Sequence, residues 1–126
     1  MFTKFRTRKG LVERDVPRTD RNIPYFADEH GEGLKYLFDI LVTYSMFNFD
    51  LGYAQGMNDL LAPILETLRD EVLAFWCFKG FLEEAGPNFS KNQLGMNAIF
   101  SRLKGVLEVV DPTLFAYLCK SARGCR

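Results

Sequence analysis

Residues 33–46 read GLKYLFDILVTYSM, and this stretch has the pattern of a helix. Its apolar side chains recur at intervals of three and four positions, which is the spacing of one face of an α-helix. They are Leu34, Leu37, Phe38, Leu41, Val42 and Tyr44. Residues 48–52 (NFDLG) then favour a turn that ends the pattern. The stretch therefore predicts a helix over residues 33–46.

Two more helical patterns follow directly. The first covers about residues 55–68 and contains Pro63, which either lies in the first turn or kinks the helix. The next covers about residues 70–84, with Asp70 as its N-cap. Because its side chains are apolar on nearly all sides, we predict a buried central helix, with Trp76 in the core.

The remaining part of the chain predicts two further helices. Ser90 and Gln93 match a capping box that opens a helix reaching about residue 110. Asp111-Pro112 is an N-cap followed by a proline in the first helical position, and begins the last helix. Alternating apolar and polar residues of the strand type do not extend beyond a few positions. The fold class predicted is therefore all-α.

We expect an orthogonal array of about five helices after an irregular, basic N-terminal segment. Residues 1–11 are predicted to be a flexible lead-in. The last helical pattern has barely two turns of apolar face, so residues 119–126 are predicted to be a disordered or non-native-like end. Residues 1–126 would then form part of a domain.

Composition restricts the class of protein further. The 126 residues are 48% hydrophobic and 14% aromatic, so a packed core is expected. No apolar run approaches the ~18 residues of a membrane span, and the N-terminus has no secretory signal pattern. Three separated cysteines and one histidine give neither a disulfide framework nor a zinc site. We therefore expect a cytoplasmic chain without a metal of its own, in which Cys77 is a buried thiol.

Charge is unevenly distributed although the net charge is zero. Residues 1–21 carry seven basic and three acidic side chains, so their net charge is +4 and that of the rest is −4. A basic segment can bind phosphate, nucleic acid, acidic lipid or an acidic protein face. It can equally be a solvated N-terminus, and charge alone leaves both interpretations open.

Residues 12–20 (VERDVPRTD) contain a pattern that core packing does not explain. Asp15 and Arg18 are three positions apart, so they can pair on one side of a helical turn. Pro17 favours an end of regular structure near Arg18, which would leave that side chain on a loop. A guanidinium held by a carboxylate keeps its charge, and its planar fork suits phosphate oxygens. A surface Asp–Arg pair of little energetic value is the alternative.

Residues 52–59 (GYAQGMND) form a second such pattern. Glycines flank an aromatic residue and Gln55 where a loop leads into a helix. The amide of Gln55 offers both a donor and an acceptor, as orienting a water molecule against a phosphate requires. A glycine-lined turn in which Gln55 caps the helix is the alternative.

Together the two patterns resemble a known family. Residues 12–19 resemble the I-x-x-D-x-x-R-T motif of TBC domains, which activate Rab-type small GTPases, and residues 53–56 resemble their Y-x-Q-G motif. Position 12 is Val where the family usually has Ile, and the R-x-x-x-W signature that normally precedes the first motif is missing. The resemblance covers about residues 6–118 and implies the first half of such a domain.

The resemblance implies a role for each matching residue. Arg18 resembles the arginine finger that stabilises charge on the transferring phosphoryl group, and Gln55 the glutamine finger that positions the attacking water. Asp15 resembles the aspartate that orients the arginine. Thr19 belongs to the first motif, and Tyr53 and Gly56 resemble the frame of the glutamine loop.

The partner implied is a Rab-type small GTPase that itself binds GTP and Mg²⁺. The chain would then need no cofactor, would bind no nucleic acid, and would reach organelle membranes only peripherally through the GTPase. Two alternatives differ in function. One is a truncated TBC fragment that binds a GTPase or another protein without stimulating hydrolysis. The other is a basic segment that binds nucleic acid or acidic lipid through charge.

Overall fold

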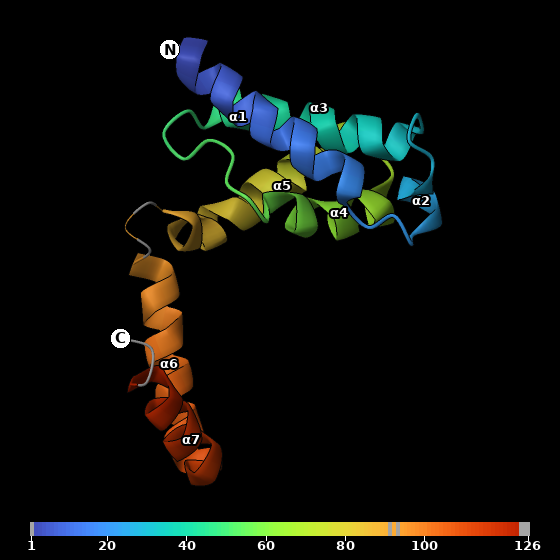
Figure 1. Cartoon of the computed structure of the whole chain (residues 1–126). Coiled ribbons are helices and arrows are strands. Elements are labelled where there is room, and N and C mark those ends of the chain that lie inside the picture. The colour runs from blue at the N-terminus through green and yellow to red at the C-terminus, as the bar shows by residue number, and fades with distance from the viewer. Residues whose placement is uncertain (1, 91, 93, 124–126) are drawn as a thin grey trace. The chain divides into compact units, whose positions relative to one another are not determined.

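The computed structural model describes residues 2–90, 92 and 94–123 (Figure 1). Over these residues all regular structure is helical, which confirms the predicted all-α class. The chain divides into two compact units, Met1–Gly86 and Pro87–Arg126. No helix among the described residues is long and apolar enough to cross a membrane.

The first unit is built on a long central helix. Its elements are α1 (Phe2–Asp15), the 3-10 turn η1 (Val16–Arg18), α2 (Pro24–Ala27), α3 (Glu32–Phe47), α4 (Met57–Leu68) and α5 (Glu71–Ala85). Helix α1 lies along α3, α3 also packs on α4 and α5, and α4 packs on α5 (Figure 1). The fully buried side chains between them include Val12, Phe26, Leu37, Leu41, Leu61, Leu65 and Phe78.

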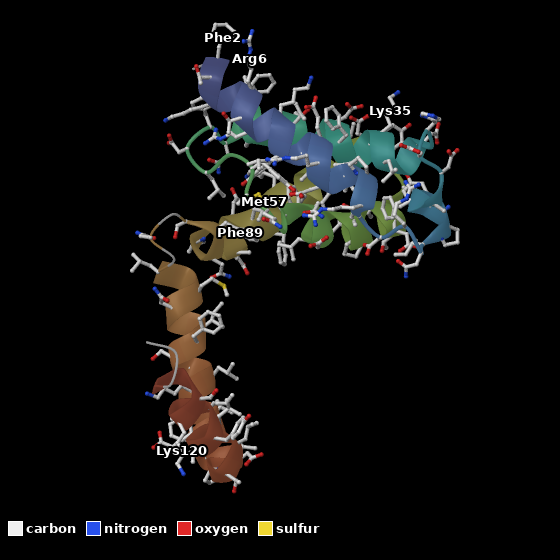
Figure 2. All side chains as sticks on the ribbon, viewed as in Figure 1. Phe2, Arg6, Lys35, Met57, Phe89 and Lys120 are labelled. Atoms are coloured by element: carbon white, nitrogen blue, oxygen red, sulfur yellow. The ribbon has the colours of Figure 1, made fainter. Side chains whose placement is uncertain are left out.

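The basic N-terminal segment is helical, and the prediction of an irregular, flexible lead-in over residues 1–11 was wrong in this respect. Helix α1 begins at Phe2, which projects from its first turn and is 83% exposed (Figure 2). Only Val12 and Asp15 of this helix are buried. An apolar stripe is therefore lacking, and the pattern that identifies an amphipathic helix in a sequence is absent here.

Helix α5 is not buried on all sides, and the predictions for Trp76 and Cys77 were both wrong. Ala74, Phe78 and Leu82 recur every four positions and face α3 and α4. Trp76 is 55% exposed, and Cys77 is exposed as well. The reason is geometric: α3 and α4 cover one face of α5, whereas Trp76 lies on another face. There the rings of Phe47 and Phe75 are edge-on neighbours, with centroids 6.3 and 5.3 Å away, and more than half of Trp76 stays exposed.

Helix ends follow the predicted chemistry where they can be compared. The Asp70 carboxylate accepts a hydrogen bond from the backbone N–H of Leu73 at 2.8 Å, which confirms the N-cap of α5. Pro63 lies inside α4, beyond its first turn, so the alternative that placed it in the first turn was wrong.

The second unit contains a helical pair, α6 (Leu94–Val110) and α7 (Pro112–Arg123), which pack on each other. Asp111 accepts a hydrogen bond from Leu114 N–H at 2.9 Å, so the predicted cap of α7 is confirmed. Helix α7 continues through Arg123, whereas residues 119–126 were predicted to be a disordered or non-native-like end. Residues 124–126 lie outside the described residues, as does Gln93 of the predicted capping box. The Ser90 hydroxyl instead donates to the Pro87 carbonyl at 2.7 Å.

Candidate functional site

The arginine loop (residues 16–20) is held in place by Asp15, the last residue of α1. Arg18 ends the short turn η1, and its Nε and Nη2 donate to Asp15 Oδ1 at 3.2 and 2.6 Å. The predicted pairing at a spacing of three is therefore present. Asp15 is buried while the Arg18 side chain is 63% exposed. The carboxylate thus anchors one edge of a guanidinium whose remaining edge is accessible to a ligand.

The second carboxylate oxygen of Asp15 joins the arginine loop to the glutamine loop (residues 52–56). The hydroxyl of buried Tyr53 donates to Asp15 Oδ2 at 2.7 Å. Burial raises the pKa of the Tyr53 hydroxyl, and its hydrogen bond to the carboxylate raises it further. Burial alone would also raise the pKa of Asp15, but the hydrogen bonds from Tyr53 and Arg18 and the charge of Arg18 outweigh it and lower that pKa. Asp15 is therefore an anion that two donors hold from opposite sides.

Replacing Asp15 by asparagine is expected to destabilise the fold by about 1–3 kcal/mol at neutral pH, because a buried, charged acceptor is lost. The pKa of Asp15 is lowered in the folded state, so its contribution is complete above the ordinary aspartate pKa of about 4 and disappears as the pH falls through the lower folded value. Urea unfolding of both chains between about pH 2 and pH 7 measures this. A stability difference that stays constant on acidification would contradict it.

The glutamine loop owes its shape to two glycines with left-handed backbone. Gly52 has φ +67° and Gly56 has φ +93°, conformations that other residues adopt only with strain. The turn at Gly56 delays the start of α4 to Met57, whereas the sequence predicted a start at Gln55. Gln55 consequently precedes the helix and is exposed. Its amide has no hydrogen-bond partner among the described residues, and the alternative in which it caps α4 receives no support.

Helix α1 supports the glutamine loop through Arg8. Its Nη1 donates to the Phe49 carbonyl at 2.7 Å, and its guanidinium carbon lies 4.9 Å from the centre of the Phe49 ring. A Cβ atom on Gly52 would meet this guanidinium at 2.2 Å, so any other residue would displace the Arg8 side chain in addition to straining the left-handed backbone. Arg8, in the basic N-terminal segment, thus connects α1 to the loop between α3 and α4.

The two predicted fingers line the same hollow. It measures about 480 Å³ and is lined by Arg18, Gln55, Gly56, Asn58 and Asp59. Asp15, Thr19 and Tyr53 lie behind these residues and are buried, so all six predicted site residues come together. Within the described part of the chain, no group of three or more His, Cys, Asp or Glu side chains could hold a metal ion.

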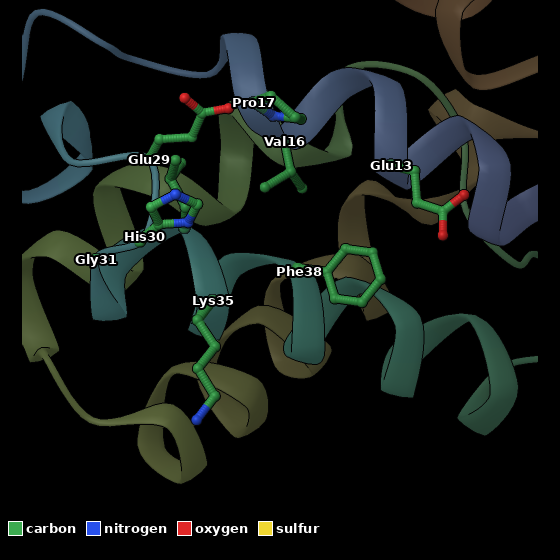
Figure 3. Close-up of a pocket in the computed structure, with 9 residues that line it drawn as sticks. Glu13, Val16, Pro17, Glu29, His30, Gly31, Lys35 and Phe38 are labelled. Carbon is green, nitrogen blue, oxygen red and sulfur yellow. The ribbon is translucent and has the colours of Figure 1, made fainter.

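A second hollow of about 480 Å³ lies next to η1 and is more apolar (Figure 3). Val16 and Pro17 border it from the arginine loop, and Phe38 borders it from α3. Glu13, Glu29, His30 and Lys35 add polar groups to its lining. It contains none of the predicted site residues.

Asn58 and Asp59 line the hollow that Arg18 and Gln55 share, but they were not predicted from the sequence as site residues. Asn58 is only 4% exposed, and its amide nitrogen donates to Asp59 Oδ1 at 2.7 Å. Helical spacing could have identified Asn58, because it lies three and seven positions before the buried Leu61 and Leu65 of the same helix. A polar side chain on a buried face requires hydrogen-bond partners. Asp59 gives no comparable signal, since an acidic residue in a first helical turn is common.

Comparison with known proteins identifies relatives along nearly the whole chain. The profile of the Rab-GTPase-TBC domain family matches residues 3–124. TBC1 domain family member 17 of Homo sapiens is 49% identical over 110 residues, covering 87% of this chain and 17% of that protein. The GTPase-activating protein gyp7 of Schizosaccharomyces pombe is 38% identical over 130 residues, covering 93% of this chain and 18% of that protein. The chain therefore spans less than a fifth of the length of these relatives.

The fold has a counterpart among solved structures. The crystal structure of the Ypt/Rab-GAP domain of Gyp1p matches with a TM-score of 0.77 and 23% sequence identity. The match covers 93% of this chain and 44% of the other. At this identity the likeness concerns the fold, which is the helical arrangement that carries the two loops.

Proposed function

Since the chain belongs to the Rab-GTPase-TBC domain family, we propose that it activates GTP hydrolysis by a Rab-type small GTPase. The observation that carries this proposal is the shared hollow, which is lined by an arginine and a glutamine from separate loops. Arg18 is the arginine finger in this proposal, and Gln55 is the glutamine finger. The alternative of a fragment that binds without stimulating hydrolysis is an outcome of the test below.

The chemistry assigned to Arg18 is electrostatic. Negative charge develops on the phosphoryl oxygens in the transition state, and a guanidinium near them lowers the barrier. The bond to Asp15 Oδ1 restricts the guanidinium plane and leaves its other edge for the phosphate. The hydrogen bond to Asp15 raises the pKa of Arg18, so its charge is secure throughout the physiological range.

The chemistry assigned to Gln55 is positional. Its amide carbonyl can accept a hydrogen bond from the attacking water while its NH₂ group donates one to a phosphoryl oxygen. The amide is exposed in the structure and has both groups available for this. GTP and Mg²⁺ belong to the GTPase in this proposal. The chain acts in the cytoplasm and meets organelle membranes through its partner.

Single-turnover GTP hydrolysis by a panel of purified Rab GTPases tests the proposal. With the matching GTPase, the chain is expected to raise the rate by about 10³–10⁵-fold, the range of arginine-finger effects. The chain carrying both Arg18→Ala and Gln55→Ala is the control, and it should give the rate of the GTPase alone. No stimulation by a chain whose circular dichroism is helical would contradict the proposal. Binding of a GTPase under those conditions would identify a non-catalytic fragment.

A further inference from the structure

Asn58 lies between the two finger loops and contacts both of them. It is the second residue of α4, it is buried, and it lies outside the two family motifs at residues 12–19 and 53–56. Its amide nitrogen donates to Thr19 Oγ1 at 3.0 Å, and Thr19 directly follows Arg18. Its amide oxygen accepts from the Gly56 N–H at 3.2 Å, and Gly56 directly follows Gln55. Each finger is thus one residue away from a hydrogen bond to the same side chain.

The amide of Asn58 is fully used in this arrangement. Both nitrogen protons are donated, one to Thr19 and one to Asp59 Oδ1. The oxygen accepts from Gly56, and the Tyr53 hydroxyl lies 3.1 Å away as a second neighbour. The single hydroxyl proton favours the nearer, charged oxygen of Asp15. No other side chain of this size combines two donors with an acceptor in one plane.

Thr19 links Asn58 to the end of α1 through hydrogen bonds. Its hydroxyl donates to the Asp15 carbonyl at 2.8 Å, and its N–H donates to the Val16 carbonyl at 3.1 Å. The hydroxyl therefore accepts from Asn58 and donates to the end of α1. This series of bonds runs from the helix that supports Arg18 to the turn that presents Gln55.

We propose that Asn58 is a positioning residue that fixes the distance between the arginine and glutamine fingers. This inference rests on the proposed function, and it assigns a role to a residue that need not touch the nucleotide. A displacement of about 1 Å in a catalytic group can lower a rate by about 100-fold. Losing Asn58 removes its bonds to both loops and leaves the bond between Tyr53 and Asp15 to join them, so it lowers the rate of the bound complex and leaves affinity nearly unchanged.

The test is Asn58→Leu, which keeps the approximate size and removes every hydrogen bond. Single-turnover GTP hydrolysis is measured across chain concentrations, which separates the maximal rate from the half-saturating concentration. The maximal rate is expected to fall about 100-fold, while the half-saturating concentration stays within about threefold. Asn97→Leu on the exposed surface of α6 is the matched control and should change neither quantity.

A second pair of variants keeps the test decisive if Asn58→Leu does not fold. Thr19→Val removes the hydroxyl that receives the Asn58 bond and keeps the side-chain shape, while Thr19→Ser keeps the hydroxyl. The maximal rate should fall about tenfold in Thr19→Val and be restored in Thr19→Ser, which is a pattern that loss of packing does not produce. Equal rates in these two variants, or a maximal rate in folded Asn58→Leu near that of the unsubstituted chain, would overturn the inference.

Hydrogen–deuterium exchange separates this inference from the proposed function, because it needs no GTPase. Asn58→Leu should accelerate exchange in residues 16–20 and also in residues 53–57, with the thermal midpoint of unfolding showing that the chain is still folded. Faster exchange in only one of the two loops would overturn the connecting role. A chain that stimulates no GTPase but loses protection in both loops would refute the proposed function and retain the connection through Asn58.

Discussion

Lysine in place of Arg18 is expected to lower the stimulated rate of GTP hydrolysis by about 10³-fold, although the charge is conserved. Two donors of the guanidinium, Nε and Nη2, meet one oxygen of Asp15, so the orientation of its plane is set. An ammonium group has no plane to orient, and a Lys bound to Asp15 has no second edge to offer a phosphate.

The control for this substitution is Arg14→Lys, four residues earlier on α1. Arg14 is exposed and its Nε donates to the Gly10 carbonyl at 3.1 Å, away from the hollow. Its replacement should leave the stimulated rate nearly unchanged. Single-turnover hydrolysis at saturating chain is the measurement for both. A rate for Arg18→Lys within about tenfold of the unsubstituted chain would remove the arginine-finger assignment.

Alanine in place of Gln55 is expected to lower the maximal rate about 100-fold, while the concentration of chain that half-saturates the GTPase changes little. The side chain is exposed and the structure shows it making no hydrogen bond within the described residues, so removing it should leave the stability of the fold unchanged. Binding and catalysis are then measured on equally folded chains. A parallel loss of affinity and maximal rate would give Gln55 a binding role instead.

Gln55→Glu refines the same experiment. Glutamate has nearly the same shape, but its carboxylate only accepts hydrogen bonds and adds a negative charge near the phosphates. If Gln55 both donates to a phosphoryl oxygen and accepts from water, Gln55→Glu should be as slow as Gln55→Ala. Restoration of the rate by glutamate would indicate that the acceptor alone matters.

Helices with an apolar stripe were predicted correctly from the sequence. The prediction was wrong for α1, which has no such stripe, and for α5, whose apolar residues lie on nearly all sides. Helix α3 was predicted nearly to the residue because its buried side chains recur at helical spacing. Helix α1 was missed because it lacks an apolar stripe, and because its contact through Arg8 is with Phe49 and Asp50, some 40 positions away. In α5, an apolar side chain does not reveal whether another element covers it, and Trp76 was therefore assigned to the core.

The same limit applies to the candidate site. The pairing of Asp15 with Arg18 is local, and a spacing of three was sufficient to predict it. That Arg18 and Gln55 line the same hollow followed only from the resemblance to a family, because no local rule brings positions 18 and 55 together. The role of Asn58 depends on bonds to Gly56 and to Thr19, and the second of these exists only in the folded chain.

The contacts that join α1 to the rest of the site have a consequence for the order of folding. They link residues 38 to 41 positions apart: Tyr53 to Asp15, Asn58 to Thr19, and Arg8 to Phe49. Closing such long loops costs entropy before any contact compensates for it, so these bonds form after the local helices. A molecule in which α1 has detached keeps the packing of α3 on α4 and α5, but it separates the two fingers. The GTPase stimulation proposed for this chain is therefore expected to be a more sensitive indicator of α1 docking than helical content, because the helices can persist when the site has opened.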